Sequence, residues 1–308
     1  MIDPSNEVTI INEYRKRIRH NYSPKVYNNT NRLIDFLNMP KWFFDNIKIE
    51  SIENIRKVAD KQLFYVSNHL SMADFLIQGY TFWKKELPIP RFIAGENLNK
   101  FPFGIFWKKC GAYYLDRDSV KNPEYMVVYD EEIKNGLRNK ENLMVYAEGG
   151  RNYSGNGLMK FQSGTIGQVL DIVKEGQDIW LVPCFINYDK RIEENVLDQV
   201  KKYKINLKKL KENTKNFKKQ DKKFRLFVED LRFKRKNKFH FSWDVWAYVQ
   251  RVFDANKGNA YLNFGDAFSI KDFLADVDNQ DAGKRKKIVL TEKVSYEIKQ
   301  LANRHGPI

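Results

Sequence analysis

The sequence predicts an α/β fold, with a mixed, largely parallel sheet flanked by helices, an N-terminal helical segment and a basic helical insertion. Short apolar runs rich in β-branched and aromatic residues recur along the chain and are typical of buried strands. Helical patterns separate several of these runs, and this alternation indicates an α/β domain. A long lysine-rich stretch without glycine or proline then interrupts the alternation.

The predicted elements follow in order along the chain. Residues 7–38 are polar with scattered Ile, Tyr and Leu, a pattern that favours helix. Strands are predicted at 47–49, 63–67, 92–94, 112–115, 143–147, 179–186 and 260–264. Helices are predicted at 73–85, 124–140, 164–174 and 285–302. We therefore expect a helical segment over residues 1–50 and one domain over residues 51–308, which contains the insertion at 196–240.

One predicted strand contains a proline. Pro183 lies within the apolar run 179–186. Because proline donates no hydrogen bond to a neighbouring strand, it favours a sheet edge or the first position of a ladder. We therefore expect this strand to be at an edge or to begin near Pro183.

Composition and charge limit the class of protein. A chain of 308 residues can form one large domain or two small ones, and 42% hydrophobic residues are enough for a core. The net charge of +15 indicates an anionic partner such as acidic lipid, nucleic acid or a phosphorylated ligand. The two cysteines, Cys110 and Cys184, favour a reducing compartment. No signal peptide is recognisable and no apolar run approaches the roughly 18 residues of a spanning helix, so we expect a cytoplasmic protein, soluble or peripheral on the inner face of a membrane.

The stretch from Asn68 to Asp74 carries the strongest chemical signal. It follows the predicted strand 63–67, so His69 and Asp74 leave the end of a strand together. Their spacing lets the carboxylate reach one imidazole nitrogen, while the other stays free to take a proton from a substrate hydroxyl. This is the base half of a Ser-His-Asp triad in which the substrate supplies the hydroxyl. A lone histidine is more often structural, so the pair needs support from other residues.

The loop after strand 143–147 offers such support. It reads Glu148-Gly149-Gly150-Arg151, and its two glycines allow the backbone to approach a ligand and present N–H groups. The forked guanidinium of Arg151 suits phosphate or carboxylate. An ordinary turn with a solvated arginine explains the same four residues, so the loop by itself is weak.

Two further strand ends carry cationic side chains. Arg117 follows the predicted strand 112–115, and Lys190 follows the predicted strand 179–186. Ligands of open α/β sheets bind at the carboxyl ends of strands, where these side chains are expected. An exposed strand end without any binding role would also commonly carry a cationic side chain, so neither residue is a strong signal by itself.

The segments at 68–74, 111–117, 148–151 and 182–190, in their order along the chain, together resemble the glycerolipid acyltransferases. Members of that superfamily share a His-x4-Asp block and three further blocks. Within that superfamily the chain is most similar to the glycerol-3-phosphate acyltransferase branch, which includes the dihydroxyacetone-phosphate enzymes. Stretches at 87–90, 94–99, 188–190 and 261–266 resemble segments of the same branch. The resemblance covers about residues 63–195 and 258–270, and leaves residues 1–50 and the basic insertion uncovered.

The resemblance implies an acyltransferase domain over residues 51–308. The implied reaction moves a fatty acyl group from a thioester, acyl-CoA or acyl carrier protein, to a hydroxyl of glycerol 3-phosphate. The alternative acceptor is lysophosphatidate. His69 would be the general base, and Asp74 would fix its tautomer and stabilise the imidazolium. No cofactor beyond the thioester co-substrate and no metal is expected.

The resemblance also implies binding roles. Arg117 and Arg151 would hold the acceptor phosphate, with Lys190 a weaker third, and Glu148 would bind glycerol hydroxyls or orient Arg151. The tetrahedral oxyanion needs donors, and backbone N–H groups of the histidine turn or of the 149–150 loop are both candidates. Asp116 departs from the pattern of the branch, which commonly has a second arginine there.

The insertion holds most of the excess positive charge. Residues 201–240 contain 17 Lys and Arg against 4 Asp and Glu, a net charge of +13. Three interpretations remain open: a helix whose lysines are merely solvated, a dock for anionic lipid, or a surface for acyl carrier protein. Nucleic acid is not expected as a partner, because no recognition motif accompanies the charge.

Overall fold

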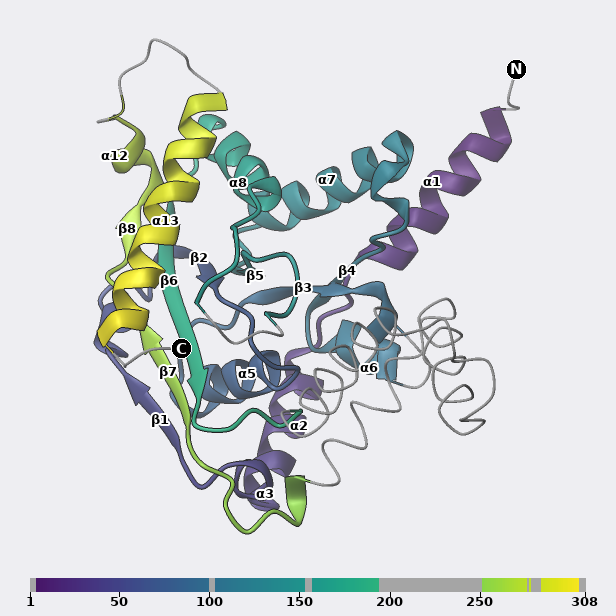
Figure 1. The fold of residues 1–308 in the computed structure, drawn as a ribbon. Coiled ribbons are helices and arrows are strands. Elements are labelled where there is room, and N and C mark those ends of the chain that lie inside the picture. The colour runs from purple at the N-terminus through teal and green to yellow at the C-terminus, as the bar shows by residue number, and fades with distance from the viewer. Residues whose placement is uncertain are drawn as a thin grey trace, which may run out of the picture.

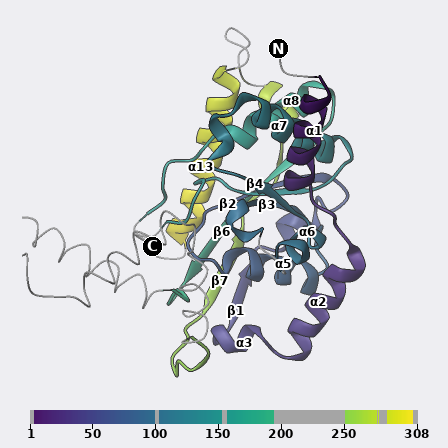
Figure 2. The same cartoon turned by 90° about the vertical axis from the view of Figure 1, so that its right-hand side faces the viewer.

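The structure is a computed structural model that describes residues 4–99, 103–152, 157–193, 251–275, 277 and 284–304. The predicted basic insertion at 196–240 lies outside these residues. The described part holds one eight-stranded sheet with helices on both faces (Figures 1 and 2). The predicted α/β class is thus confirmed.

The strands lie close to the predicted runs. They are β1 (Ile47–Glu50), β2 (Gln62–Ser67), β3 (Arg91–Gly95), β4 (Ala112–Leu115), β5 (Leu143–Tyr146), β6 (Ile179–Tyr188), β7 (Ala260–Phe264) and β8 (Phe268–Ser269). The two-residue β8 was not predicted, because it is too short to carry a period-two pattern.

The helices alternate with the strands. They are α1 (Pro4–Ile18), α2 (Pro24–Phe36), α3 (Pro40–Phe43), α4 (Glu53–Arg56), α5 (Asp74–Lys84), α6 (Phe103–Lys109), α7 (Pro123–Arg138), α8 (Gly164–Lys174), α12 (Ile270–Ala275) and α13 (Lys284–Arg304). The start of α7 shows why a helix begins there. The side chain of Asn122 accepts hydrogen bonds from the N–H groups of Glu124 and Tyr125, and Pro123 fills the first helical position.

The strand order is β1-β7-β6-β2-β5-β3-β4, with β8 paired to β6. Pairing is parallel except at β6–β7 and β6–β8, so the sheet is mixed and largely parallel. The carboxyl ends of β2, β5, β3 and β4 therefore meet at one edge of the sheet, where ligands bind in such folds.

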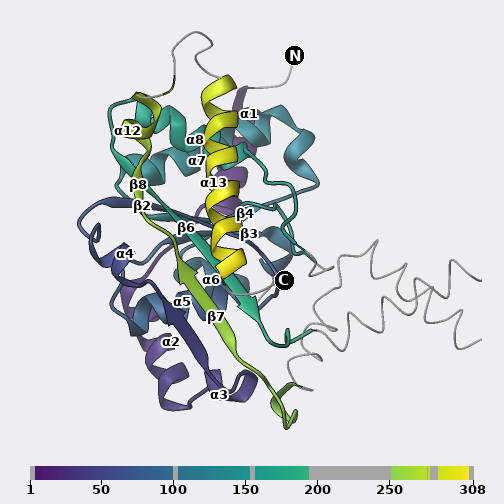
Figure 3. The same cartoon turned by 60° about the vertical axis from the view of Figure 1, so that its left-hand side comes forward.

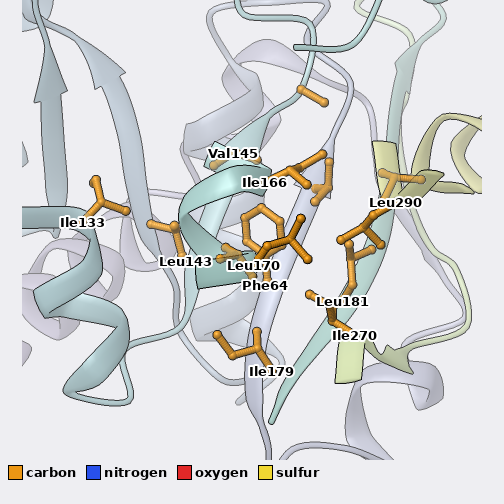
Figure 4. Close-up of a cluster of buried hydrophobic side chains, with 14 of the residues drawn as sticks. Phe64, Ile133, Leu143, Val145, Ile166, Leu170, Ile179, Leu181, Ile270 and Leu290 are labelled. Atoms are coloured by element: carbon orange, nitrogen blue, oxygen red, sulfur yellow. The ribbon is translucent and has the colours of Figure 1, made fainter. Parts of the chain in front are cut away.

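Each face of the sheet has its own apolar core. Because successive side chains of a strand alternate, Phe64 and Val66 of β2 pack toward α7, α8 and α13, as Figure 4 shows for Phe64 with Ile166 and Leu170. Leu63 and Tyr65 of the same strand pack on the opposite face, toward α5. Figure 3 shows α13 lying along β6. With both faces covered, β2 is buried throughout, as expected for a central parallel strand.

The N-terminal segment packs on this domain. The predicted helical segment 1–50 contains α1, α2 and α3, and its last residues, 47–50, form β1 of the sheet. The helix α1 contacts α7, and α2 contacts α5. The Arg17 guanidinium of α1 donates to Glu96, at 2.9 and 2.6 Å, and to Asp116, at 3.1 Å. Asp116, which stands where the branch commonly has an arginine, thus binds an arginine of α1.

The expected edge position of the proline strand is wrong. β6 lies between β2 and β7, and Pro183 faces Val66 of β2. On the other side of β6, β8 pairs with Trp180 and Leu181, and β7 pairs from Cys184 onward. Pro183 falls between these two partner strands, where no antiparallel ladder needs its missing N–H.

Candidate active site

The candidate site lies at the carboxyl ends of β2, β4 and β5. Ser67, the last residue of β2, is in register with Tyr146, the last of β5. The loops that leave these strands therefore begin side by side, and they carry His69 and Glu148. Asp74 is the first residue of α5, which follows the β2 loop.

His69 and Asp74 form a hydrogen-bonded pair. Nδ1 of His69 lies 2.6 Å from Oδ2 of Asp74. The same carboxylate accepts the N–H groups of Leu70, at 2.8 Å, and Ser71, at 3.1 Å, so the turn itself fixes it. The Asp74 side chain is fully buried, whereas that of His69 keeps 17% of its surface exposed and lines a cavity. Among the described residues, no group bonds Nε2 of His69, so this nitrogen is available for proton transfer.

An aromatic ring fixes the plane of the imidazole. The rings of His69 and Tyr146 are stacked, with centroids 4.3 Å apart and planes at 20°. The Tyr146 hydroxyl donates to Gln78 of α5 at 2.7 Å, and Gln78 donates to Ser67 at 3.0 Å. Burial holds the pKa of Tyr146 well above its usual range, so the hydroxyl remains a donor.

Glu148 ties the glycine loop to the histidine turn. Its carboxylate accepts the N–H of His69 at 2.9 Å and that of Met159 at 2.8 Å. Burial raises the pKa of Glu148, against the opposing effect of these two donors. Gly149 has φ of +66° and a Cβ there would lie 2.9 Å from Gln162, so only glycine suits this position.

The three predicted cations lie in different surroundings. Arg117 lines the cavity, and its guanidinium donates to the Gly149 carbonyl at 2.9 Å. Arg151 approaches the carboxylate of Glu193 at 3.4 Å, and its side chain is 15% exposed. Lys190 is paired with Asp254 and does not line the cavity. The structure therefore brings Arg117 to His69 and Glu148, and does not bring Lys190 there.

Two residues of the site were not predicted as site residues from sequence. Glu193 is buried, and it accepts the Ser71 hydroxyl at 2.7 Å and the Met72 N–H at 3.0 Å. Tyr188, at the end of β6, donates its hydroxyl to Oδ1 of Asp74 at 2.5 Å. These contacts join residues more than a hundred positions apart, and no local spacing signals them. In the sequence, Tyr188 was marked only as part of the stretch 188–190, which resembles a segment of the glycerol-3-phosphate acyltransferase branch.

A cavity of about 680 Å³ opens beside His69. His69, Arg117 and Glu148 are among its polar lining residues. The remainder is largely apolar, lined by residues from α2, α5, β3, β4 and α7, among them Tyr27, Ile34, Phe75, Phe92, Ala112 and Met126. Its volume and lining suit a long apolar ligand with a polar head.

Two further properties of the described residues bear on the site. No cluster of three or more His, Cys, Asp or Glu side chains is arranged to hold a metal ion in this part of the chain. Over the same residues, no helix has both the length and the apolar character needed to cross a bilayer.

Much of the chain is similar in sequence to known proteins. The family model described as Acyltransferase matches residues 46–187, which include β1 through β5, all of β6 but its last residue, and His69, Asp74, Arg117 and Glu148. The chain is 28% identical over 235 residues to a glycerol-3-phosphate acyltransferase of Pseudoalteromonas atlantica, covering 75% of this chain and 25% of that protein.

A second glycerol-3-phosphate acyltransferase, from Shewanella denitrificans, is 25% identical over 281 residues, covering 89% of this chain and 30% of that protein. The chain thus spans less than a third of the length of these relatives. A solved 1-acyl-sn-glycerophosphate acyltransferase of Thermotoga maritima aligns with a TM-score of 0.41 and 16% identity, over 96% of this chain and 83% of that one. Residues 46–187 thus match the acyltransferase family model, and the resemblance to the acyltransferases stated from the sequence is confirmed.

Proposed function

We propose that this protein transfers a fatty acyl group from an acyl thioester to a hydroxyl of glycerol 3-phosphate. One observation carries the proposal: His69 of the His69–Asp74 pair lines a largely apolar cavity that Arg117 also lines. The base suits the acceptor hydroxyl, the cation suits the acceptor phosphate, and the apolar lining suits a fatty acyl chain. The relatives named glycerol-3-phosphate acyltransferase support the same acceptor.

The proposed reaction needs no covalent acyl-enzyme. Nε2 of His69 takes the proton of the acceptor hydroxyl as its oxygen attacks the thioester carbonyl carbon. The tetrahedral intermediate then expels the thiolate, the C–S bond breaks, and the proton returns from His69 to the leaving sulfur. Asp74 holds Nδ1 and stabilises the imidazolium in between. Proton transfer by a positioned base typically contributes ~10²–10⁴-fold to rate.

The geometry favours the glycine loop as donor to the oxyanion. In the histidine turn, the N–H groups of His69, Leu70 and Ser71 are already bonded to the carboxylates of Glu148 and Asp74. The N–H of Gly149 donates to Tyr146. Gly150 lines the cavity, and its N–H has no acceptor among the described residues. We therefore assign the oxyanion to the Gly150 N–H.

Arg117 is the proposed ligand of the acceptor phosphate. Among the residues described as lining the cavity it is the one permanently cationic side chain. Its bond to the Gly149 carbonyl holds the guanidinium beside the proposed oxyanion donor. Arg151, to which the resemblance also gave a phosphate role, is not among the residues that line the cavity and lies 3.4 Å from the buried carboxylate of Glu193.

The decisive experiment incubates the pure protein with palmitoyl-CoA and a panel of acceptors and follows free thiol. We expect thiol release with glycerol 3-phosphate and a lipid product of matching amount. Release with lysophosphatidate and none with glycerol 3-phosphate would replace the proposed acceptor with the alternative. Parallel reactions with palmitoyl-acyl carrier protein identify the preferred donor.

We further propose that the protein works at an anionic membrane surface, on the cytoplasmic side. The lysine-rich segment 201–240 supports this, since each Lys or Arg near such a surface adds about 1 kcal/mol. On α2 and α3, Leu33, Phe36 and Trp42 expose apolar side chains, and α2 also lines the cavity through Ile34. Vesicles with phosphatidylglycerol should therefore sediment more protein than neutral vesicles, and equal binding to both would contradict the electrostatic proposal.

A further inference from the structure

A buried tyrosine contacts the carboxylate of the proposed base pair from the opposite side. Tyr188 ends β6, 114 residues after Asp74, and its hydroxyl lies 2.5 Å from Oδ1 of Asp74. We propose that Tyr188 is a positioning residue that sets the proton affinity of His69 through Asp74. The proposal rests on the proposed function only in taking His69 as the general base.

The partners of Asp74 show why this hydroxyl matters. The carboxylate is fully buried, and within the described residues its ion-pair partner is His69 alone. Its remaining donors are the N–H groups of Leu70 and Ser71 and the Tyr188 hydroxyl. A carboxylate out of water depends on such donors to remain charged, because each one spreads its negative charge. Among the described residues, Tyr188 supplies the one side-chain donor to Asp74 apart from the imidazole.

The surroundings of Tyr188 keep it in this role. Burial, with the Asp74 carboxylate beside it, holds the pKa of Tyr188 well above its usual range. The hydroxyl therefore stays protonated and donates. Its ring is stacked on Phe44, with centroids 5.4 Å apart, and its backbone pairs with Ala260 of β7. The ring position is thus set by packing, independently of the hydroxyl.

The other titratable groups around the pair are engaged elsewhere. Those that face it are Tyr146 and Glu148 from β5 and its loop, Cys184 and Glu193 from β6 and the turn after it, Arg151 from the glycine loop, and Arg117 from the loop after β4. Tyr146 donates to Gln78, Glu148 accepts two backbone N–H groups, and Glu193 accepts Ser71 and Arg151. Tyr188 is the group among them that donates to Asp74.

Removal of the hydroxyl has a definite direction. Without it, the charge of Asp74 is less delocalised and attracts the Nδ1 proton more strongly. The His69–Asp74 pair then binds its proton more tightly, and a higher pH is needed to free the base. Because the remaining donors take up part of the lost hydrogen bond, we expect the proton affinity of the pair to change by about tenfold, a shift of about one pH unit.

The test compares Tyr188→Phe with Tyr261→Phe. Tyr261, on β7, also donates to an aspartate, Asp189, at 2.8 Å, but neither residue lines the cavity. We expect the acid limb of the kcat/KM profile to move up by about one pH unit in Tyr188→Phe and to stay in place in Tyr261→Phe. An unmoved limb in a folded Tyr188→Phe, or equal shifts in both variants, overturns the proposal.

A second measurement does not require turnover. The chain has 4 histidines, so a ¹⁵N-histidine NMR titration, assigned with His69→Gln, follows His69 directly. Its midpoint should rise in Tyr188→Phe, and incorporation of 3-fluorotyrosine at position 188, a stronger donor, should lower it. If Tyr188→Phe does not fold, the fluorotyrosine variant decides alone, and an unchanged or raised midpoint contradicts the proposal. Because no substrate is present, this outcome is independent of whether glycerol 3-phosphate is the acceptor.

Discussion

At the scale of single residues, turnover depends on the imidazole of His69. We expect His69→Ala to lower kcat by ~10²–10⁴-fold, because it removes the base and leaves the cavity and Arg117 in place. The fold should persist, because the N–H groups of Leu70 and Ser71 and the Tyr188 hydroxyl still bond the buried Asp74 carboxylate when the imidazole is removed. Near wild-type transfer in His69→Ala would show that another group is the base.

His20 offers a matched histidine control. Its Nε2 lies 2.9 Å from Glu141, and it does not line the cavity. His20→Ala should lower the melting temperature and leave kcat close to that of the wild type. The two variants together separate a catalytic imidazole from a structural one.

The phosphate role of Arg117 is tested through KM. We expect Arg117→Ala to raise the KM for glycerol 3-phosphate by about tenfold or more, the value of one charge-assisted hydrogen bond, and to leave the KM for palmitoyl-CoA unchanged. Glycerol, which lacks phosphate, should show no such change. An unchanged KM for glycerol 3-phosphate would remove the role assigned to Arg117.

Arg151 should behave differently from Arg117. Its loss leaves the buried Glu193 carboxylate without its cation, so Arg151→Ala should destabilise the fold as well as impair transfer. Arg151→Ala combined with Glu193→Gln should recover part of that stability. This contrast shows what the sequence could not supply: both arginines end similar segments, and only the tertiary contacts distinguish them.

At the scale of elements, the loop after β5 contains two glycines with unequal demands. Gly149 has a positive φ, and a Cβ there would meet Gln162. At Gly150, φ is not positive, and a Cβ would lie 3.9 Å from Arg117. Gly149→Ala should therefore destabilise the protein by about 1–2 kcal/mol, whereas Gly150→Ala should be tolerated and keep its N–H. Chemical denaturation measures the free energy of unfolding of both variants, and kcat is measured on the same samples. Equal losses of stability in the two variants would contradict this prediction.

The helix α5 carries the other informative glycine. Gly79 lines the cavity, and a Cβ there would lie in ordinary contact with Tyr27 and Phe92. Gly79→Ala should thus stabilise the helix by about 1 kcal/mol with little effect on transfer. Gly79→Leu should fill cavity volume and shift preference from palmitoyl-CoA toward shorter acyl-CoA donors. An unaltered chain-length profile in Gly79→Leu would place the acyl chain elsewhere.

At the scale of the whole molecule, one carboxylate joins the N-terminal segment to the sheet. Glu141 precedes β5 and contacts His20, at 2.9 Å, the Tyr113 hydroxyl, at 2.9 Å, and Arg91, at 3.6 Å. Burial raises the pKa of Glu141, but His20, Arg91 and Tyr113 outweigh it and hold the pKa below its usual range. The Glu141 carboxylate therefore binds a proton more readily in the unfolded chain than in the native protein. Its contribution to the free energy of unfolding is full above the ordinary pKa of a glutamate and is lost as pH falls through the lowered native pKa.

Glu141→Gln tests this coupling. It should lower the free energy of unfolding near neutral pH, and the difference from wild type should shrink as pH falls through the lowered native pKa of Glu141, where the wild-type carboxylate also becomes neutral. The exposed Glu86 provides the control, since Glu86→Gln should change stability little at either pH. A difference that stays constant over this range would contradict the assigned ionisation.

The sequence by itself determined the fold class, the positions of most strands and helices, and the pairing of His69 with Asp74. Those features follow from local periodicity and short spacing, because an apolar run and a histidine five residues from an aspartate need no distant partner to be recognised. Only the tertiary structure decided that Tyr188 supports Asp74, that Glu193 takes Arg151, and that Lys190 belongs to Asp254. Each of these contacts depends on which strand ends become neighbours in the sheet, and that order is set by packing of the two apolar cores across the whole chain.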